Sequence, residues 1–138
     1  MNEYLRVLVV HRQISMANDI KKQFDYAGWL VHVAQSGLDG LLAARKESFS
    51  LIISAIDLPV ITGIEMVRGI RNFSFNVNTS VVFLDQTPDK DYKPIMKKLK
   101  ASIHRGGLDG ISELINAHER TRAIQSFMGI DPKTDQLN

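Results

Sequence analysis

Five short apolar runs alternate along the chain with segments in which apolar residues recur every three or four positions. The runs are rich in Val, Ile and Leu and are bounded by polar, Gly or Pro residues, which is typical of strands buried on both faces of a parallel sheet. They occupy residues 5–10, 29–34, 51–53, 80–84 and 101–104. The spacing in the intervening segments predicts helices over residues 15–27, 36–44, 64–71, 92–100 and 108–128.

Some local signals refine these helices. Ser15 is the expected cap of the first helix, and Gly28 its stop. In the second helix we expect three leucines to point inward: Leu38, Leu41 and Leu42. Strict alternation of five strands with five helices predicts one α/β domain in three layers, a parallel sheet with helices on both faces.

Composition narrows the class of protein. The 138 residues carry 17 Lys and Arg against 15 Asp and Glu, a net charge of +2, which is too small to indicate nucleic-acid binding. The absence of Cys excludes disulfides and thiolate metal sites. No apolar run is long enough to span a membrane, and the N-terminal residues lack the layout of a signal peptide. A cytoplasmic protein without a membrane partner is therefore expected.

The carboxyl ends of the predicted strands are the expected place for a functional site, because ligands of open α/β sheets bind there. The residues at these ends are His11, Arg12, Ala55, Asp57, Asp85 and Arg105. His11 and His104 do not make a convincing metal pair, because His104 and Arg105 alternate along one strand and project to opposite faces.

Over residues 5–118 the sequence resembles the response-regulator receiver domains of two-component signalling. The resemblance rests on VLVV (7–10), AQSGLDGLLAA (34–44), LIISAIDLPVITGIEMVRGIR (51–71) and VVFL (81–84). Its most specific part is the pattern of Leu58, Pro59, Gly63 and Glu65. The resemblance implies a CheY-like, flavodoxin-like (βα)5 fold with strand order 2-1-3-4-5, for which a chemotaxis receiver is the standard illustration.

The resemblance also implies a phosphorylation site, yet this sequence departs from it at every position. The family has an acidic pair that holds Mg²⁺ after the first strand, where this chain has His11 and Arg12. The phosphoacceptor carboxylate is replaced by Ala55. The family's hydroxyl and lysine positions hold Asp85 and Arg105, the latter followed by Gly in place of Pro. We therefore expect a pseudo-receiver that binds no Mg²⁺ or other cofactor and is not an enzyme.

The replacements can compensate one another. The strand order implied by the resemblance places the fourth and fifth strands side by side, so we predict a partly buried salt bridge between Asp85 and Arg105. Asp57 has two open interpretations: an ion pair or hydrogen bond from Arg12, or a plain loop carboxylate.

The leading hypothesis is a signalling module that acts by protein–protein interaction through the face formed by the fourth helix, fifth strand and fifth helix. The residues expected on that face are Lys93, Lys97, Lys100, Ile111, Ile115 and His118. We expect a receiver-like domain over residues 1–118, followed by a helix extension and disordered tail over 119–138. The extension carries Ile124, Phe127 and Met128, which predict a homodimer or a linker to an output domain unless they fold back on the domain.

Two alternatives remain open. The chain could be an atypical phosphoacceptor that uses Asp57 or Asp85. It could instead bind a small anion or nucleotide through His11, Arg12 and Arg105 at the strand ends, although no glycine-rich phosphate loop is present. Direct binding of nucleic acid is not expected, because no helix-turn-helix follows residue 108.

Overall fold

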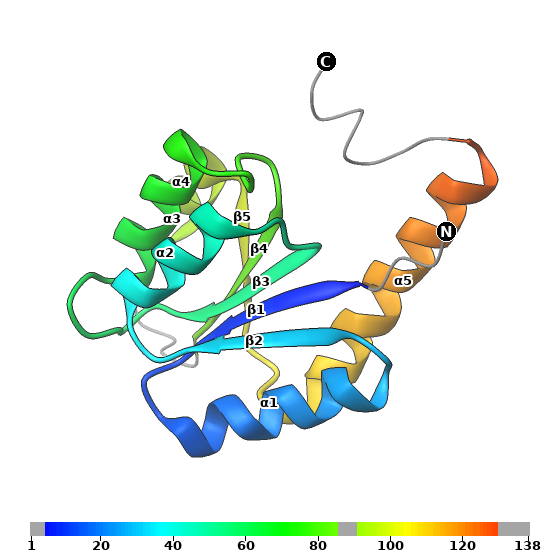
Figure 1. Ribbon diagram of the computed structural model, residues 1–138, viewed down its shortest axis with the longest axis horizontal. Coiled ribbons are helices and arrows are strands. Elements are labelled where there is room, and N and C mark those ends of the chain that lie inside the picture. The colour runs from blue at the N-terminus through cyan, green and yellow to red at the C-terminus, as the bar shows by residue number, and fades with distance from the viewer. Residues whose placement is uncertain (1–4, 86–90, 130–138) are drawn as a thin grey trace.

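The computed structural model describes residues 5–85 and 91–129, so the last nine residues of the extension and tail expected over 119–138 lie outside these ranges. Five parallel strands form one sheet in the order β2-β1-β3-β4-β5, which confirms the predicted fold class and strand order (Figure 1). The strands are β1 Arg6–Val10, β2 Leu30–Ala34, β3 Leu51–Ala55, β4 Ser80–Leu84 and β5 Ala101–His104.

Five helices connect or follow these strands. Their bounds are α1 Ile14–Tyr26, α2 Gly37–Lys46, α3 Gly63–Phe73, α4 Lys93–Leu99 and α5 Ile111–Phe127, with a short 3₁₀ turn at Leu108–Gly110 before α5. Helices α1 and α5 cover one face of the sheet, and α2, α3 and α4 cover the other (Figure 1). In the described part of the chain, no helix combines the length and the apolar character needed to cross a bilayer.

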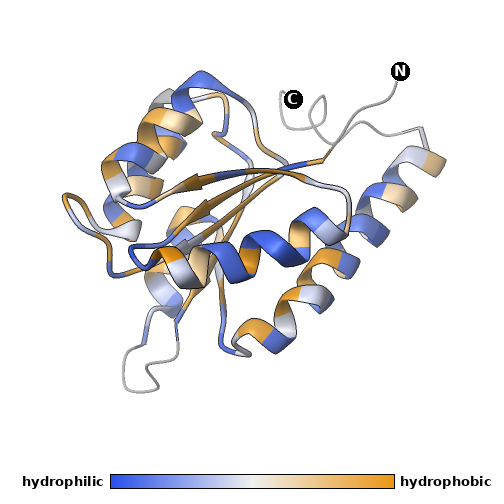
Figure 2. Ribbon diagram, turned by 60° about the horizontal axis from the view of Figure 1, so that its bottom comes forward, coloured by the Kyte–Doolittle hydropathy of each residue, from blue (hydrophilic) through white to orange (hydrophobic). Residues whose placement is uncertain are grey.

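Alternate side chains of the strands point into two separate apolar cores. One core joins Leu8, Ile52 and Phe83 to Met66 and other residues of α2, α3 and α4. The second joins Val7, Val9 and Ile53 to α1 and α5. Every residue of β3 is buried, and the hydroxyl of Ser54, its one polar side chain, donates a 2.7 Å hydrogen bond to the carbonyl of Ala55. The strands of the sheet are mostly hydrophobic, as expected for a sheet covered on both faces (Figure 2).

Two local expectations were wrong. Helix α1 begins at Ile14 after Gln13, so Ser15 lies inside the first turn and does not cap it. In α2, Leu38 and Leu42 are each 42% exposed, and the buried positions are instead Gly37, Gly40, Ala43 and Ala44. The helix packs so closely that a β-carbon at Gly37 would lie 2.2 Å from the backbone carbonyl oxygen of Ile61. Small residues are therefore required on the inner face of α2.

The last helix is held against the domain along its first half. Ile111 and Ile115 are buried, and farther along Trp29 contacts the ring of His118 and donates a 2.8 Å hydrogen bond to Glu119. Beyond this point α5 extends past the sheet (Figure 1). Ile124, Phe127 and Met128 are 60%, 93% and 64% exposed, so the alternative in which they fold back on the domain is wrong.

Candidate functional site at the strand ends

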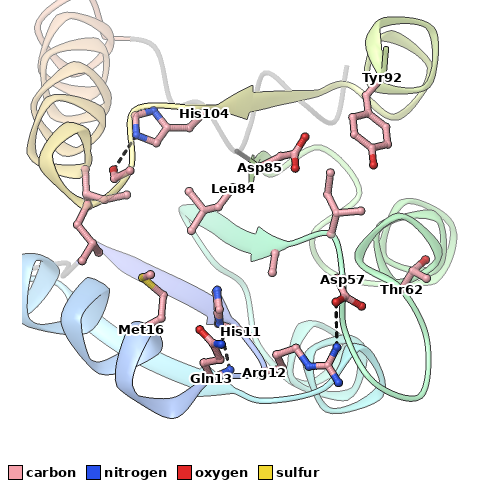
Figure 3. Close-up of a pocket in the computed structure, with 15 residues that line it drawn as sticks. His11, Arg12, Gln13, Met16, Asp57, Thr62, Leu84, Asp85, Tyr92 and His104 are labelled. Carbon is pink, nitrogen blue, oxygen red and sulfur yellow. Dashed lines mark hydrogen bonds and ion pairs between the residues drawn. The ribbon is translucent and has the colours of Figure 1, made fainter. Parts of the chain in front are cut away.

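A cavity of about 660 Å³ opens at the carboxyl ends of β1, β3, β4 and β5 (Figure 3). It brings together five residues singled out in the sequence: His11, Arg12, Ala55, Asp57 and Asp85. His104 lines the same cavity, whereas Arg105 lines a smaller cavity between α4 and β5. The two neighbours therefore face different sides of their strand, as predicted.

Ala55 is the last residue of β3 and is 8% exposed. The chain turns sharply after it, and the amide of Gly63 donates a 2.8 Å hydrogen bond to the carbonyl of Ile56. A β-carbon at Gly63 would lie 2.3 Å from the carbonyl oxygen of Ala55, so the turn needs glycine. The side chain that this turn presents to the cavity is a methyl group.

Arg12 and Asp57 form an ion pair across the site. The Nη1 atom of Arg12 lies 2.9 Å from Oδ2 of Asp57 and donates a hydrogen bond to it (Figure 3). The interpretation of Asp57 as a plain loop carboxylate is thereby excluded. Both side chains are well exposed, so the pair contributes at most about 1 kcal/mol to stability. Its main effect is to join the loop after β1 to the loop after β3.

Asp85 and Arg105 form the second predicted pair. Oδ2 of Asp85 lies 3.9 Å from Nη1 of Arg105, and the side chains are 10% and 46% exposed. The salt bridge and its partial burial are confirmed. The distance is at the upper limit for an ion pair and longer than a hydrogen bond. Because β4 and β5 are adjacent, each residue directly follows its strand at the same level of the sheet.

His11 is held in one tautomer. Its Nδ1 accepts a 3.1 Å hydrogen bond from the backbone amide of Gln13, which leaves the proton of a neutral ring on Nε2. Burial lowers the pKa of His11, and the adjacent charge of Arg12 lowers it further. At neutral pH the ring is therefore an uncharged donor that lines the cavity.

The motif after β3 has a structural explanation. The hydroxyl of Thr62 accepts a hydrogen bond from the amide of Glu65, and the carboxylate of Glu65 accepts one from the amide of Thr62. This capping box fixes the first turn of α3. The carbonyl of Pro59 meanwhile accepts the amide of Gly37 at 3.2 Å, which ties the loop to α2. Glu65 therefore stabilises a helix start and does not line the cavity.

Several walls of the cavity were missed in the sequence. Met16, Thr62, Tyr92 and Leu108 line it, although they come from four separate segments. The 3.6-residue pattern could have placed Met16 near the start of α1, but no signal in the sequence placed the other three residues at the site.

Two residues expected on the interaction face are buried instead. Ile111 and Ile115 are 0% and 3% exposed because they pack in the core beside α1.

The sequence model of the response regulator receiver domain matches residues 7–104. The chain belongs to this family. YkoG of Bacillus subtilis, an uncharacterized transcriptional regulatory protein, is 30% identical over 87 residues, which cover 61% of this chain and 37% of YkoG. The virulence sensor protein BvgS of Bordetella pertussis is 37% identical over 67 residues, or 49% of this chain and 5% of BvgS. The chain thus spans little more than a third, or less, of these relatives' lengths.

Solved receiver structures share the fold. The chemotaxis response regulator CheY4 of Vibrio cholerae superposes with a TM-score of 0.75 at 25% identity, covering 84% of this chain and 99% of CheY4. The receiver domain of the sensor histidine kinase PA1611 of Pseudomonas aeruginosa, determined with magnesium in its active-site cleft, gives a TM-score of 0.73 at 16% identity. It covers 86% of this chain and 97% of that one. The protein is thus a receiver domain of two-component signalling.

The side chains at the strand ends of this receiver do not fit the Mg²⁺ ion that the family uses. Mg²⁺ requires anionic oxygens in near-octahedral geometry. Here the positions after β1 hold an imidazole and a guanidinium, and the carboxylate of Asp57 is already bound by Arg12. Within residues 5–85 and 91–129, no three His, Asp or Glu side chains are grouped to hold a metal ion.

Proposed function

We propose that this receiver domain signals without being phosphorylated, as a non-catalytic module that binds a protein partner. The observation that carries the proposal is the side chain of Ala55, a methyl group at the end of β3, where the family has its nucleophilic carboxylate. The ion pair of Arg12 with Asp57 supports it, because a guanidinium lies where a receiver needs a metal cation. Neither Mg²⁺ nor another cofactor is required.

Phosphorylation can be tested directly. After incubation with acetyl phosphate and Mg²⁺, the intact mass of the chain is expected to stay unchanged, because the described residues around Asp57 and Asp85 include no group of side chains that could hold a metal ion. A receiver with an intact site, treated in parallel, controls for the phosphodonor. A mass increase of one phosphoryl group, lost on replacing either aspartate by Asn, would show an atypical phosphoacceptor and overturn the proposal.

The partner surface that we propose lies on α4, β5 and α5. Lys93, Lys97 and Lys100 are exposed on or beside α4 and are suited to an acidic partner. We expect Lys97→Glu with Lys100→Glu to weaken partner capture about tenfold or more. Lys22→Glu with Lys46→Glu makes the same charge change on α1 and α2 and serves as the control. Equal loss of capture in both double variants would contradict the assignment of this face.

The exposed end of α5 is proposed as a contact between two copies of the chain. Three large apolar side chains there would remain in water in a monomer, and pairing two helices would bury them. Light scattering coupled to size exclusion is expected to give a dimer for the full chain and a monomer for a chain cut after His118. The cut leaves the core contacts of Ile111 and Ile115 in place. Equal monomeric masses would contradict dimerisation through this helix.

A further inference from the structure

Basic residues are concentrated in the part of the chain that runs from α3 to β5. Residues 66–84 and 92–108 contain seven Lys and Arg and no Asp or Glu, although the two charge types are nearly equal in number over the whole chain. Three of these lysines, Lys97, Lys98 and Lys100, are exposed at the C-terminal end of α4. This end of α4 therefore carries positive charge without a carboxylate in the same stretches of chain.

The guanidinium of Arg71 joins the basic end of α4 to the loop between α3 and β4. Its Nε donates a 2.9 Å hydrogen bond to the carbonyl of Leu99, and its Nη2 donates one of 3.1 Å to the carbonyl of Lys100. Its Nη1 donates to the carbonyls of Asn76 and Val77, both at 3.0 Å. The planar fork of a guanidinium fixes the directions of such bonds. The loop and the end of α4 are therefore held side by side.

The loop carries two apolar side chains that the domain leaves largely uncovered. Phe75 is 68% exposed and Val77 is 41% exposed. Apolar side chains that lie together and are rimmed by charged groups mark interaction sites more often than isolated ones do. We propose that these two side chains and the three lysines bind an acidic segment of a partner protein that carries an apolar anchor residue. The α3–α4 patch is the name used below for Phe75, Val77, Lys97, Lys98 and Lys100.

The two halves of the α3–α4 patch select different features of this partner. The lysines favour carboxylates, which accelerate association and make it dependent on salt. Phe75 and Val77 gain free energy when an apolar side chain covers them, and a carboxylate cannot supply that gain. A nucleic acid would contact the lysines but leave the aliphatic side chain of Val77 without an apolar partner. The inference rests on the proposed function, in which α4 contacts an acidic partner, and adds the loop before β4 to that contact.

The test is an NMR titration of the ¹⁵N-labelled full chain with three synthetic peptides. The first has a Phe-Leu pair between runs of Asp and Glu, the second has Ser-Ser in place of that pair, and the third has Lys in place of the acids. The first is expected to cause saturable shifts at residues 75–77 and 97–100 and to bind about tenfold more tightly than the second, because its anchor is buried. The third should not bind. Equal affinity for the first two, or no saturable shift at these residues with the first, would overturn the inference.

Substitutions separate the α3–α4 patch from general charge attraction. Phe75→Ser with Val77→Ser is expected to weaken binding of the first peptide about tenfold. Neither side chain belongs to the buried cores, so the fold should be retained. Ile124→Ser with Phe127→Ser removes two exposed apolar side chains from α5 and is the matched control, which should leave the affinity unchanged. Equal loss of affinity in the two double variants would contradict the assignment.

Arg71→Lys tests the link between the two halves of the patch. The substitution keeps the positive charge but loses the planar fork that reaches four carbonyls. We expect weaker binding of the first peptide and faster hydrogen exchange at residues 76–77 and 98–100, with exchange in β1 and β3 unchanged. Arg68→Lys, on the exposed face of α3, is the control. An unchanged affinity in folded Arg71→Lys would refute the role of the guanidinium, and the serine variants keep the proposal testable if Arg71→Lys does not fold.

Two other classes of ligand are tested against the same labelled chain at equal ionic strength: phosphatidylserine vesicles and a single-stranded oligonucleotide. Tighter binding of either one than of the first peptide would assign the patch to a membrane or a nucleic acid and overturn the inference. The proposed function can fail separately, because a phosphorylated chain is detected by its mass whatever the peptides do. A chain that takes up no phosphate and binds no acidic peptide would contradict the patch and leave the absence of phosphorylation standing.

Discussion

Replacing Asn76 by Ala is expected to lower the free energy of unfolding by about 3–5 kcal/mol, because it leaves several buried backbone groups without partners. Asn76 is fully buried in the loop between α3 and β4. Its Oδ1 accepts hydrogen bonds from the amide of Phe49 at 2.8 Å and the hydroxyl of Thr79 at 3.0 Å. Its Nδ2 donates to the carbonyls of Ala44 at 2.7 Å and Glu47 at 2.9 Å.

This side chain therefore connects the end of α2, the start of β3 and the loop before β4. Urea denaturation of the variant and of the wild type measures the difference. Asn72→Ala is the matched control, because Asn72 donates a single exposed hydrogen bond to Arg68 within α3. We expect that control to change stability by less than about 0.5 kcal/mol. Equal stabilities for the two variants would show that the buried network contributes little.

The fold was predictable because its main signals are local. Runs such as 51–53 are too short for a free-standing helix and suit strands buried on both faces, and their alternation with helical spacing favours a parallel sheet. The errors in α2 arose from a global effect. Leucine is the usual core residue of a helix, but the close approach of α2 to α3 and the sheet leaves room there only for Gly and Ala. The sequence of residues 36–46 alone does not indicate how closely α2 approaches α3 and the sheet.

The candidate site was predictable in part, because the strand order determines which strand ends are neighbours. The pair of Asp85 with Arg105 followed from knowing which strand ends are adjacent, so a correct strand order was sufficient to predict it, whereas the pairing of Asp57 with Arg12 was one of two open interpretations. The walls of the cavity depend on how loops and helix starts fold over those ends. Thr62 and Tyr92 come from such segments, and Asn76 likewise stabilises the core from within a loop. The roles of these residues depend on the tertiary arrangement of loops and helix starts, which no local sequence pattern specifies.

The ion pairs connect the site to the proposed function. Arg12 with Asp57 joins the loops after β1 and β3, and Asp85 with Arg105 joins the ends of β4 and β5. Each pair links segments that a metal ion and a phosphoryl group connect in an active receiver. In the proposed function, fixed protein charges take the place of these transient ligands at the same strand ends. This arrangement favours a module with one constant state, or one set by a noncovalent ligand, over a phosphorylation switch.

We expect Mg²⁺ to bind only when His11, Arg12 and Ala55 are all replaced by aspartate. In the triple variant His11→Asp, Arg12→Asp, Ala55→Asp, Mg²⁺ should raise the melting temperature, because a cation relieves the repulsion among the clustered carboxylates. Ala55→Asp alone should show no such rise, since Arg12 keeps its positive charge at the strand ends and holds the carboxylate of Asp57. Wild type with Mg²⁺, and each variant with NaCl of equal ionic strength, are the controls.

The comparison of the single and triple variants locates the barrier to metal binding. If Ala55→Asp alone were stabilised by Mg²⁺ and took up a phosphoryl group, His11 and Arg12 would be compatible with a metal site, and the missing carboxylate would be the sole obstacle. If the triple variant alone responds, the guanidinium of Arg12 is itself an obstacle, because it occupies Asp57 and brings positive charge to the strand ends. The second result is the one that the geometry predicts, since a cation and a guanidinium compete for the same carboxylates.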